Sequence, residues 1–230
     1  MNRIDKIVLN IPHSSSVFPD GVSSGWEEGI QKEIERWTDS YTDRLFHTNM
    51  ENVVSVVFPY SRFYCDAERL DGDPLEKEGR GIIYTNFNGI SRTGLTDEER
   101  SDIMRLYHEH KKMVSEQIIS DNCLLIDCHS FPGDLSDIDF CIGYNDDWSK
   151  PDDAVIDTVS KYFTELGYKV GINEPYSNSY SPKTEYEYKS LMIEVNKNVY
   201  LNSRNEIDGF FYKKNAMIQG LYRRLFDIYT

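Results

Sequence analysis

The segment Cys123–Cys128 reads CLLIDC, and the fold prediction starts from it. A nearly continuous apolar run of this length is typical of a central strand with both faces covered. Further apolar runs of strand length alternate along the chain with segments of helical periodicity. This alternation predicts an α/β fold, a three-layer α/β/α architecture with a central mixed sheet. The predicted strands span 6–11, 52–58, 123–128, 138–143, 168–173 and 191–195, and the predicted helical segments span 29–50, 96–119, 151–166 and 207–229.

The composition and charge indicate which partners and which cell compartment to expect. The 230 residues carry 25 Lys+Arg against 39 Asp+Glu, a net charge of −14, which disfavours a nucleic-acid partner. Local arginines still allow a small anionic substrate. The apolar start of the chain is too short for a signal peptide, and no run approaches the roughly 18 apolar residues of a membrane helix. The four cysteines lack CxxC spacing and lie in or beside apolar runs. We therefore expect a single cytoplasmic domain over residues 1–230, with reduced core thiols and no membrane contact.

Polar side chains follow the predicted strands at the ends where α/β sheets bind ligands. His13 follows the first strand, His129 follows the central one, and Glu194 stands near the end of a late strand. A single histidine here is more often a hydrogen-bonded residue of a turn. Two such histidines with a carboxylate favour a metal instead, because neutral imidazoles plus a carboxylate are the usual ligands of a catalytic zinc ion.

The third ligand comes from one of two acids. Asp39 and Asp43 are four residues apart in a predicted helix, so both lie on one helical face. We favour Asp39 as the ligand, although Thr38 or Asp39 could instead cap the helix. Asp43 is the alternative ligand, an ion-pair partner, or a carboxylate that holds a ligand imidazole in place.

A second cluster predicts how an anionic substrate binds. Arg62 and Arg69 could each hold a carboxylate with two parallel hydrogen bonds, and Asp66 could orient them. A surface network of ion pairs is the rival interpretation.

The segment 71–92 is dense in Gly, Asp and Asn and predicts a long irregular excursion of the kind that often carries function. The sequence holds no GxSxG elbow and no phosphate-binding loop, and a Cys128–His129 dyad is disfavoured because strand neighbours point to opposite faces.

Taken in their order along the chain, these motifs resemble those of the N-formylglutamate amidohydrolase family, whose fold is similar to that of zinc carboxypeptidases. The resemblance runs from Ile11 to about Asn202. The matching elements are Pro12-His13-Ser14-Ser15, the acids Asp39 and Asp43, the set Arg62, Asp66 and Arg69, the helical His110, Asp127-Cys128-His129-Ser130, Asn173-Glu174-Pro175-Tyr176, and Ile193-Glu194-Val195-Asn196 with Tyr200.

The chain departs from the family pattern at three places. Ser15 replaces a glycine, Glu68 stands where an asparagine is common, and Ser177-Asn178-Ser179 replaces a glycine-rich turn. These changes leave the proposed metal ligands in place and alter the surroundings of the substrate. The resemblance therefore implies a small N-acyl amino acid such as N-formylglutamate, or a similar amide, as the substrate.

The resemblance also implies a role for each site residue. His13, Asp39 and His129 would hold Zn²⁺, and Glu194 would act as the general base. Arg62 would help to stabilise the oxyanion, and the substrate would be bound by Arg62, Asp66, Arg69 and His110. Two alternatives stay open: a zinc peptidase or amidase acting on cell-wall or other peptides, and a non-catalytic anion-binding module on the same fold.

Overall fold

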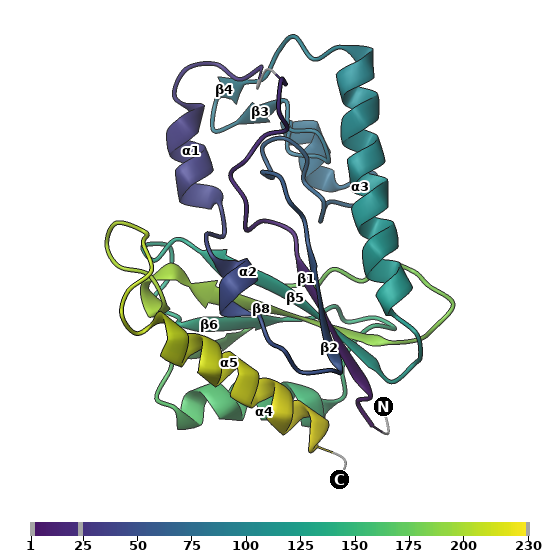
Figure 1. Cartoon of the computed structure of the whole chain (residues 1–230), viewed down its shortest axis with the longest axis vertical. Helices are drawn as coiled ribbons and strands as arrows, with labels where there is room; N and C mark the ends of the chain where they lie inside the picture. Colours follow the sequence, from purple (N-terminus) through teal and green to yellow (C-terminus); the bar gives the residue numbers. More distant parts are fainter. Residues whose placement is uncertain (1–2, 23–24, 229–230) are drawn as a thin grey trace.

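A six-stranded sheet forms the centre of the computed structural model, which describes residues 3–22 and 25–228. Figure 1 shows the sheet with helices packed around it. The strands lie in the order β2-β1-β5-β8-β6-β7. Their bounds are β1 (Lys6–Ile11), β2 (Val53–Val57), β5 (Cys123–Phe131), β6 (Phe140–Gly143), β7 (Val170–Ile172) and β8 (Lys189–Asn196). Each neighbouring pair is parallel except β6 and β8, which are antiparallel. The predicted mixed central sheet is confirmed.

Strand β5 lies inside this sheet and is buried along its whole length. Its alternate residues enter different cores. Ile126 and Cys128 pack in the core that includes β1 and α5, whereas Leu125 packs in the core under α3. Asp127 and His129 therefore share the α3 face with Leu125, and the thiol of Cys128 lies opposite the imidazole of His129. The strand extends past Cys128 to Phe131, so His129 lies within it rather than after it.

Helices cover both faces of the sheet, as predicted (Figure 1). Helix α3 (Asp97–Gln117) packs on one face, where Val114 contacts the core that contains Val8. The short α2 (Thr42–Leu45), α4 (Asp153–Glu165) and α5 (Phe211–Phe226) cover the other face. Thr96 begins α3 with a capping box in which it and Glu99 bond reciprocally. Helix α5 ends before the expected limit at 229, a residue outside the described part of the chain.

The structure corrects the prediction for the segment 29–50. It forms α1 (Ile30–Trp37) and α2, with Asp39 in the connection between them. The expectation that Asp39 and Asp43 lie on one helical face is therefore wrong. The helix stops because the N–H of Asp39 donates to the carbonyl of His13 at 2.9 Å, a tertiary bond that replaces the next turn. Tyr41, with φ +66°, then redirects the chain into α2.

The predicted excursion lies beside the carboxyl end of β5, where Arg80 and Tyr84 line a cavity together with Ser130. It contains the 3₁₀ helix η1 (Pro74–Glu78) and a separate hairpin of β3 (Asn86–Phe87) and β4 (Ile90–Ser91). A second 3₁₀ helix, η2 (Lys197–Val199), follows β8.

The four cysteines are buried and unpaired. Within residues 3–22 and 25–228, none of the helices has the length and apolar character needed to span a bilayer.

Candidate active site

Three neighbouring parallel strands bring the predicted site residues together. His13 follows β1, His129 lies in β5 and Glu194 lies in β8. Strand β5 pairs with both of the others, and His129 and Glu194 are register partners. Because the carboxyl ends of parallel strands meet at one edge of a sheet, these side chains converge there.

Asp39 reaches the two histidines from the α1–α2 connection. Its Oδ2 lies 3.1 Å from His129 Nδ1 and 3.9 Å from His13 Nδ1. These three residues are buried, and their ligand atoms all lie within 4.8 Å of one another. Asp43, the alternative ligand, lies in α2 and belongs to none of the potential metal-binding groups in the described part of the chain.

This group fits a metal ion by geometry. Atoms that bind one zinc ion at about 2.1 Å in a tetrahedron lie about 3.4 Å apart, close to the observed spacings. The side chain of His13 is fully buried, yet its Nδ1 has no hydrogen-bond partner among the described residues. An orphaned buried nitrogen of this kind costs about 1–3 kcal/mol, which a cation bound there would offset.

The charges around the histidines also fit a cation. His129 Nε2 lies 3.1 Å from Asp127 Oδ1 and 3.5 Å from Glu68 Oε1, and Asp39 faces its other ring nitrogen. Burial acts to lower the pKa of His129, but Glu68 and Asp127 outweigh burial and raise that pKa well above its usual value. The site therefore stabilises positive charge, whether an imidazolium or a metal ion supplies it.

Asp66 connects the histidine cluster to the predicted arginines. It is fully buried, and its Oδ1 lies 2.8 Å from His13 Nε2. Its Oδ2 lies 3.1 Å from Arg62 Nη2, 3.5 Å from Arg69 Nε and 2.5 Å from the hydroxyl of Tyr84. Burial acts to raise the pKa of Asp66, but His13 and both arginines hold it well below its usual range. Asp66 thus fixes the His13 ring and the guanidinium groups together.

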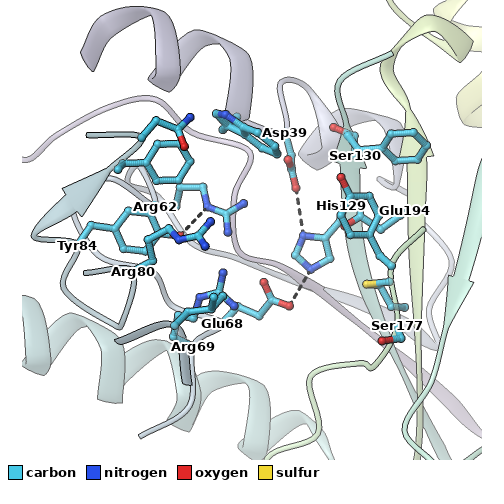
Figure 2. Close-up of a pocket in the computed structure, with 17 residues that line it drawn as sticks. Asp39, Arg62, Glu68, Arg69, Arg80, Tyr84, His129, Ser130, Ser177 and Glu194 are labelled. Carbon is cyan, nitrogen blue, oxygen red and sulfur yellow. Dashed lines mark hydrogen bonds and ion pairs between the residues drawn. The ribbon is translucent and has the colours of Figure 1, made fainter. Parts of the chain in front are cut away.

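A cavity of about 380 Å³ opens over this cluster. Arg62, Arg69 and Arg80 lie along one side of it, and His129 and Glu194 lie on the other (Figure 2). The arginine side chains are 15%, 21% and 34% exposed, so each can reach a ligand. The cavity thus places a cationic wall opposite the candidate metal site.

Glu194 is suited to hold a proton. Its Oε2 is buried without a hydrogen-bond partner among the described residues. Burial raises the pKa of Glu194 to about 8, and the negative charges of Asp39 and Glu68 act in the same direction. A carboxyl group whose pKa lies near neutrality can both accept and release a proton at physiological pH.

His110 does not lie where a substrate contact would. Its side chain is fully buried and is not among the residues that line the cavity. Its Nε2 donates to Asn10 Oδ1 at 2.8 Å, and Asn10 Nδ2 donates to Asp127 Oδ1 at 2.8 Å. Because Asp127 contacts His129, this buried chain connects His110 to the site. The expectation that His110 contacts the substrate is corrected to a supporting position behind the site.

Sequence reasoning assigned no role to two carboxylates of the site. The signal for Asp127 was available, because residues two apart in a strand share a face and Asp127 precedes His129 by two. Glu68 gave no such signal. It lies in the segment after β2, and only the folded chain shows that its carboxylate faces both imidazoles.

Comparisons with known proteins agree with this fold. A sequence model of the N-formylglutamate amidohydrolase family matches residues 5–201. A crystal structure of N-formylglutamate amidohydrolase from Ralstonia eutropha superposes with a TM-score of 0.76 at 20% identity, covering 96% of this chain and 93% of that one. A gene product of Agrobacterium tumefaciens superposes with a TM-score of 0.68 at 12% identity, covering 96% and 92%. A search of curated proteins finds no significant match. The two structural similarities show a shared fold.

Proposed function

The chain belongs to the N-formylglutamate amidohydrolase family, a family of hydrolases that cleave amide bonds, and we propose that it hydrolyses a small N-acyl amino acid such as N-formylglutamate with the help of Zn²⁺. One observation carries the proposal. The buried Nδ1 of His13, without a hydrogen-bond partner in the described residues, faces Asp39 and His129, and these two residues line a cavity together with Glu194 and three arginines.

His13, Asp39 and His129 are the residues that would hold the zinc ion. When bound, a zinc ion lowers the pKa of a water molecule toward about 7 and polarises an adjacent carbonyl group. Asp66 supports the His13 ring through a hydrogen bond at Nε2, and Asp127 Oδ1 lies 3.1 Å from His129 Nε2, on the same side of that ring as Glu68. Carboxylates in these positions fix the tautomer and orientation of a ligand imidazole.

Glu194 accepts a proton from the attacking water and later delivers it to the nitrogen of the departing amine. The water oxygen bonds to the acyl carbon, the C–N bond breaks, and the products are a carboxylic acid and a free amino acid. Arg62 lies on the opposite side of the cavity, where its guanidinium can stabilise the negative charge that develops on the acyl oxygen.

Arg69 and Arg80 give the cavity its preference for an anionic substrate. The guanidinium of Arg69 already contacts Asp66 at 3.5 Å and Asp73 at 3.7 Å, so its direction is set before a ligand binds. Arg80 pairs with Glu78 at the cavity edge. A substrate with one or two carboxylates could bind both guanidiniums.

The test is a panel of N-formyl and N-acetyl amino acids and short peptides, assayed by the release of free amine from the zinc-loaded protein. We expect N-formylglutamate or a related acidic N-acyl amino acid to give the highest kcat/KM. Arg69→Lys should raise KM for acidic substrates, because lysine cannot form the two parallel hydrogen bonds. A preference for uncharged peptides, or no turnover of any amide, would refute the proposed substrate class.

A further inference from the structure

Glu68 has no task in the reaction described above, although it lies against the metal site. Its Oε2 is 3.7 Å from His13 Nδ1, and its Oε1 is 3.5 Å from His129 Nε2. Figure 2 shows the His129 ring between Asp39 on one side and Glu68 on the other. The Glu68 side chain is 24% exposed and lines the cavity, so its carboxylate has room to move.

The nitrogen of His13 that lacks a hydrogen bond faces two carboxylates. Its Nδ1 lies 3.9 Å from Asp39 Oδ2 and 3.7 Å from Glu68 Oε2. Both distances are slightly longer than the spacing of about 3.4 Å between atoms that bind one zinc ion. Glu68 also joins His13 and Asp66, and separately Asp127 and His129, in groups whose ligand atoms lie within 4.8 Å of one another. A small movement of the Glu68 side chain would bring Oε2 to a cation bound by Nδ1 of His13.

Charge gives a second, independent argument. Two neutral imidazoles and the carboxylate of Asp39 leave a divalent ion with one uncompensated positive charge. The Glu68 carboxylate is largely buried and lies against both imidazoles. Because neutral imidazoles that bind a metal offer no positive charge, a carboxylate in this position needs a cationic partner. The metal ion satisfies both requirements.

We propose that Glu68 is a further protein ligand of the metal ion that the proposed function assigns to His13, Asp39 and His129, giving a site of two imidazoles and two carboxylates. Oε2 of Glu68 binds the cation, and Oε1 accepts the N–H of His129 Nε2. The inference rests on the proposed metal dependence, and it adds a ligand to this chain's site.

The test measures metal binding without turnover. Wild-type protein, Glu68→Gln and Glu68→Asn are compared by chelator competition for Zn²⁺ and by the visible absorption spectrum of the Co²⁺-loaded form, whose band positions and intensities depend on the ligands. Gln keeps an oxygen that can accept from His129 and loses only the charged ligand. We expect both variants to bind Zn²⁺ at least about tenfold more weakly than the wild type and to change the Co²⁺ spectrum.

Glu78→Gln is the matched control, because Glu78 lies close to Glu68 in the sequence, within the excursion 71–92, and pairs with Arg80 instead of the histidines. It should bind Zn²⁺ as the wild type does. Circular dichroism of the metal-free proteins checks that the variants fold. If the wild type binds zinc and both Glu68 variants match it in affinity and spectrum, the inference is overturned while the proposed function stands. If the wild type takes up no zinc, the proposed metal dependence fails as well.

Discussion

Replacing Asp66 by Asn removes the negative charge that His13, Arg62 and Arg69 share. Asp66 is fully buried and contacts all three, so Asp66→Asn leaves two guanidiniums facing a neutral amide. Removing one partner of a buried ion pair costs about 3–5 kcal/mol. The arginine side chains are 15% and 21% exposed, and water recovers part of that cost. We therefore expect the free energy of unfolding to fall by about 3 kcal/mol.

The same substitution weakens the metal site. Asn can still accept a hydrogen bond from His13 Nε2, but it no longer increases the basicity of the ring as a carboxylate does. Loss of such a supporting carboxylate typically lowers metal affinity by about 10–100-fold. Both effects are measured on one preparation, the first by urea denaturation of the metal-free protein and the second by chelator competition for Zn²⁺.

Asp134→Asn is the control for this experiment. The Asp134 carboxylate pairs with Arg36 at 3.0 Å, but its side chain is 67% exposed. Solvent screens such a pair, so the denaturation midpoint should not change measurably. If Asp66→Asn unfolds at the same urea concentration as the wild type and binds zinc equally well, Asp66 does not hold the site together and the reasoning is refuted.

Three further predictions concern Glu194 and His110. Glu194→Gln should keep its zinc and lose about 10²–10⁴-fold in turnover of N-formylglutamate, measured by amine release; turnover equal to the wild type would exclude Glu194 as the base. In the metal-free protein the pKa of Glu194 is raised from 4.5 to about 8, so between these values the folded state keeps a proton that the unfolded state has lost. Stability should therefore fall as the pH rises through this window, and it should fall less in Glu194→Gln; equal slopes in urea denaturation at several pH values would contradict the raised pKa. His110→Phe leaves the buried Oδ1 of Asn10 without its donor, so unfolding should become easier by about 1–3 kcal/mol with KM unchanged, whereas a higher KM at unchanged stability would restore His110 as a substrate contact.

Much of the fold could be predicted because local patterns and tertiary structure agree. The apolar run at Cys123–Cys128 forms the buried β5, and the capping box at Thr96 begins α3. The alternation of strand and helical segments gives both the mixed sheet and the helical layers on its two faces. Such signals are local, so they can be interpreted without knowledge of the contacts between distant segments.

The site was predictable where it depends on strand ends. The sequence places His13 and His129 at the carboxyl ends of strands, and the parallel pairing of β1 and β5 brings them together. The choice between Asp39 and Asp43 depended on where α1 stops. That point is set by the bond from Asp39 N–H to the carbonyl of His13, a tertiary contact that helical periodicity does not encode.

Glu68 shows what local patterns leave out. In the sequence it is an acid next to Arg69 at a position where the family commonly has asparagine, and no spacing relates it to His13 or His129. In the folded chain the segment after β2 brings it against His13 and His129, whose strands are distant in sequence. Contacts of this kind come from the closing of long loops, and only coordinates reveal them.

Metal content tests the account most directly. Purified wild-type protein, Asp39→Ala, His129→Ala and Asp43→Ala are incubated with zinc, dialysed and analysed by mass spectrometry of the metal. We predict about one zinc per chain in the wild type and in Asp43→Ala, and loss of bound zinc in Asp39→Ala and His129→Ala. A wild type without zinc, or an Asp39→Ala variant that keeps it, would contradict the assignment of this site.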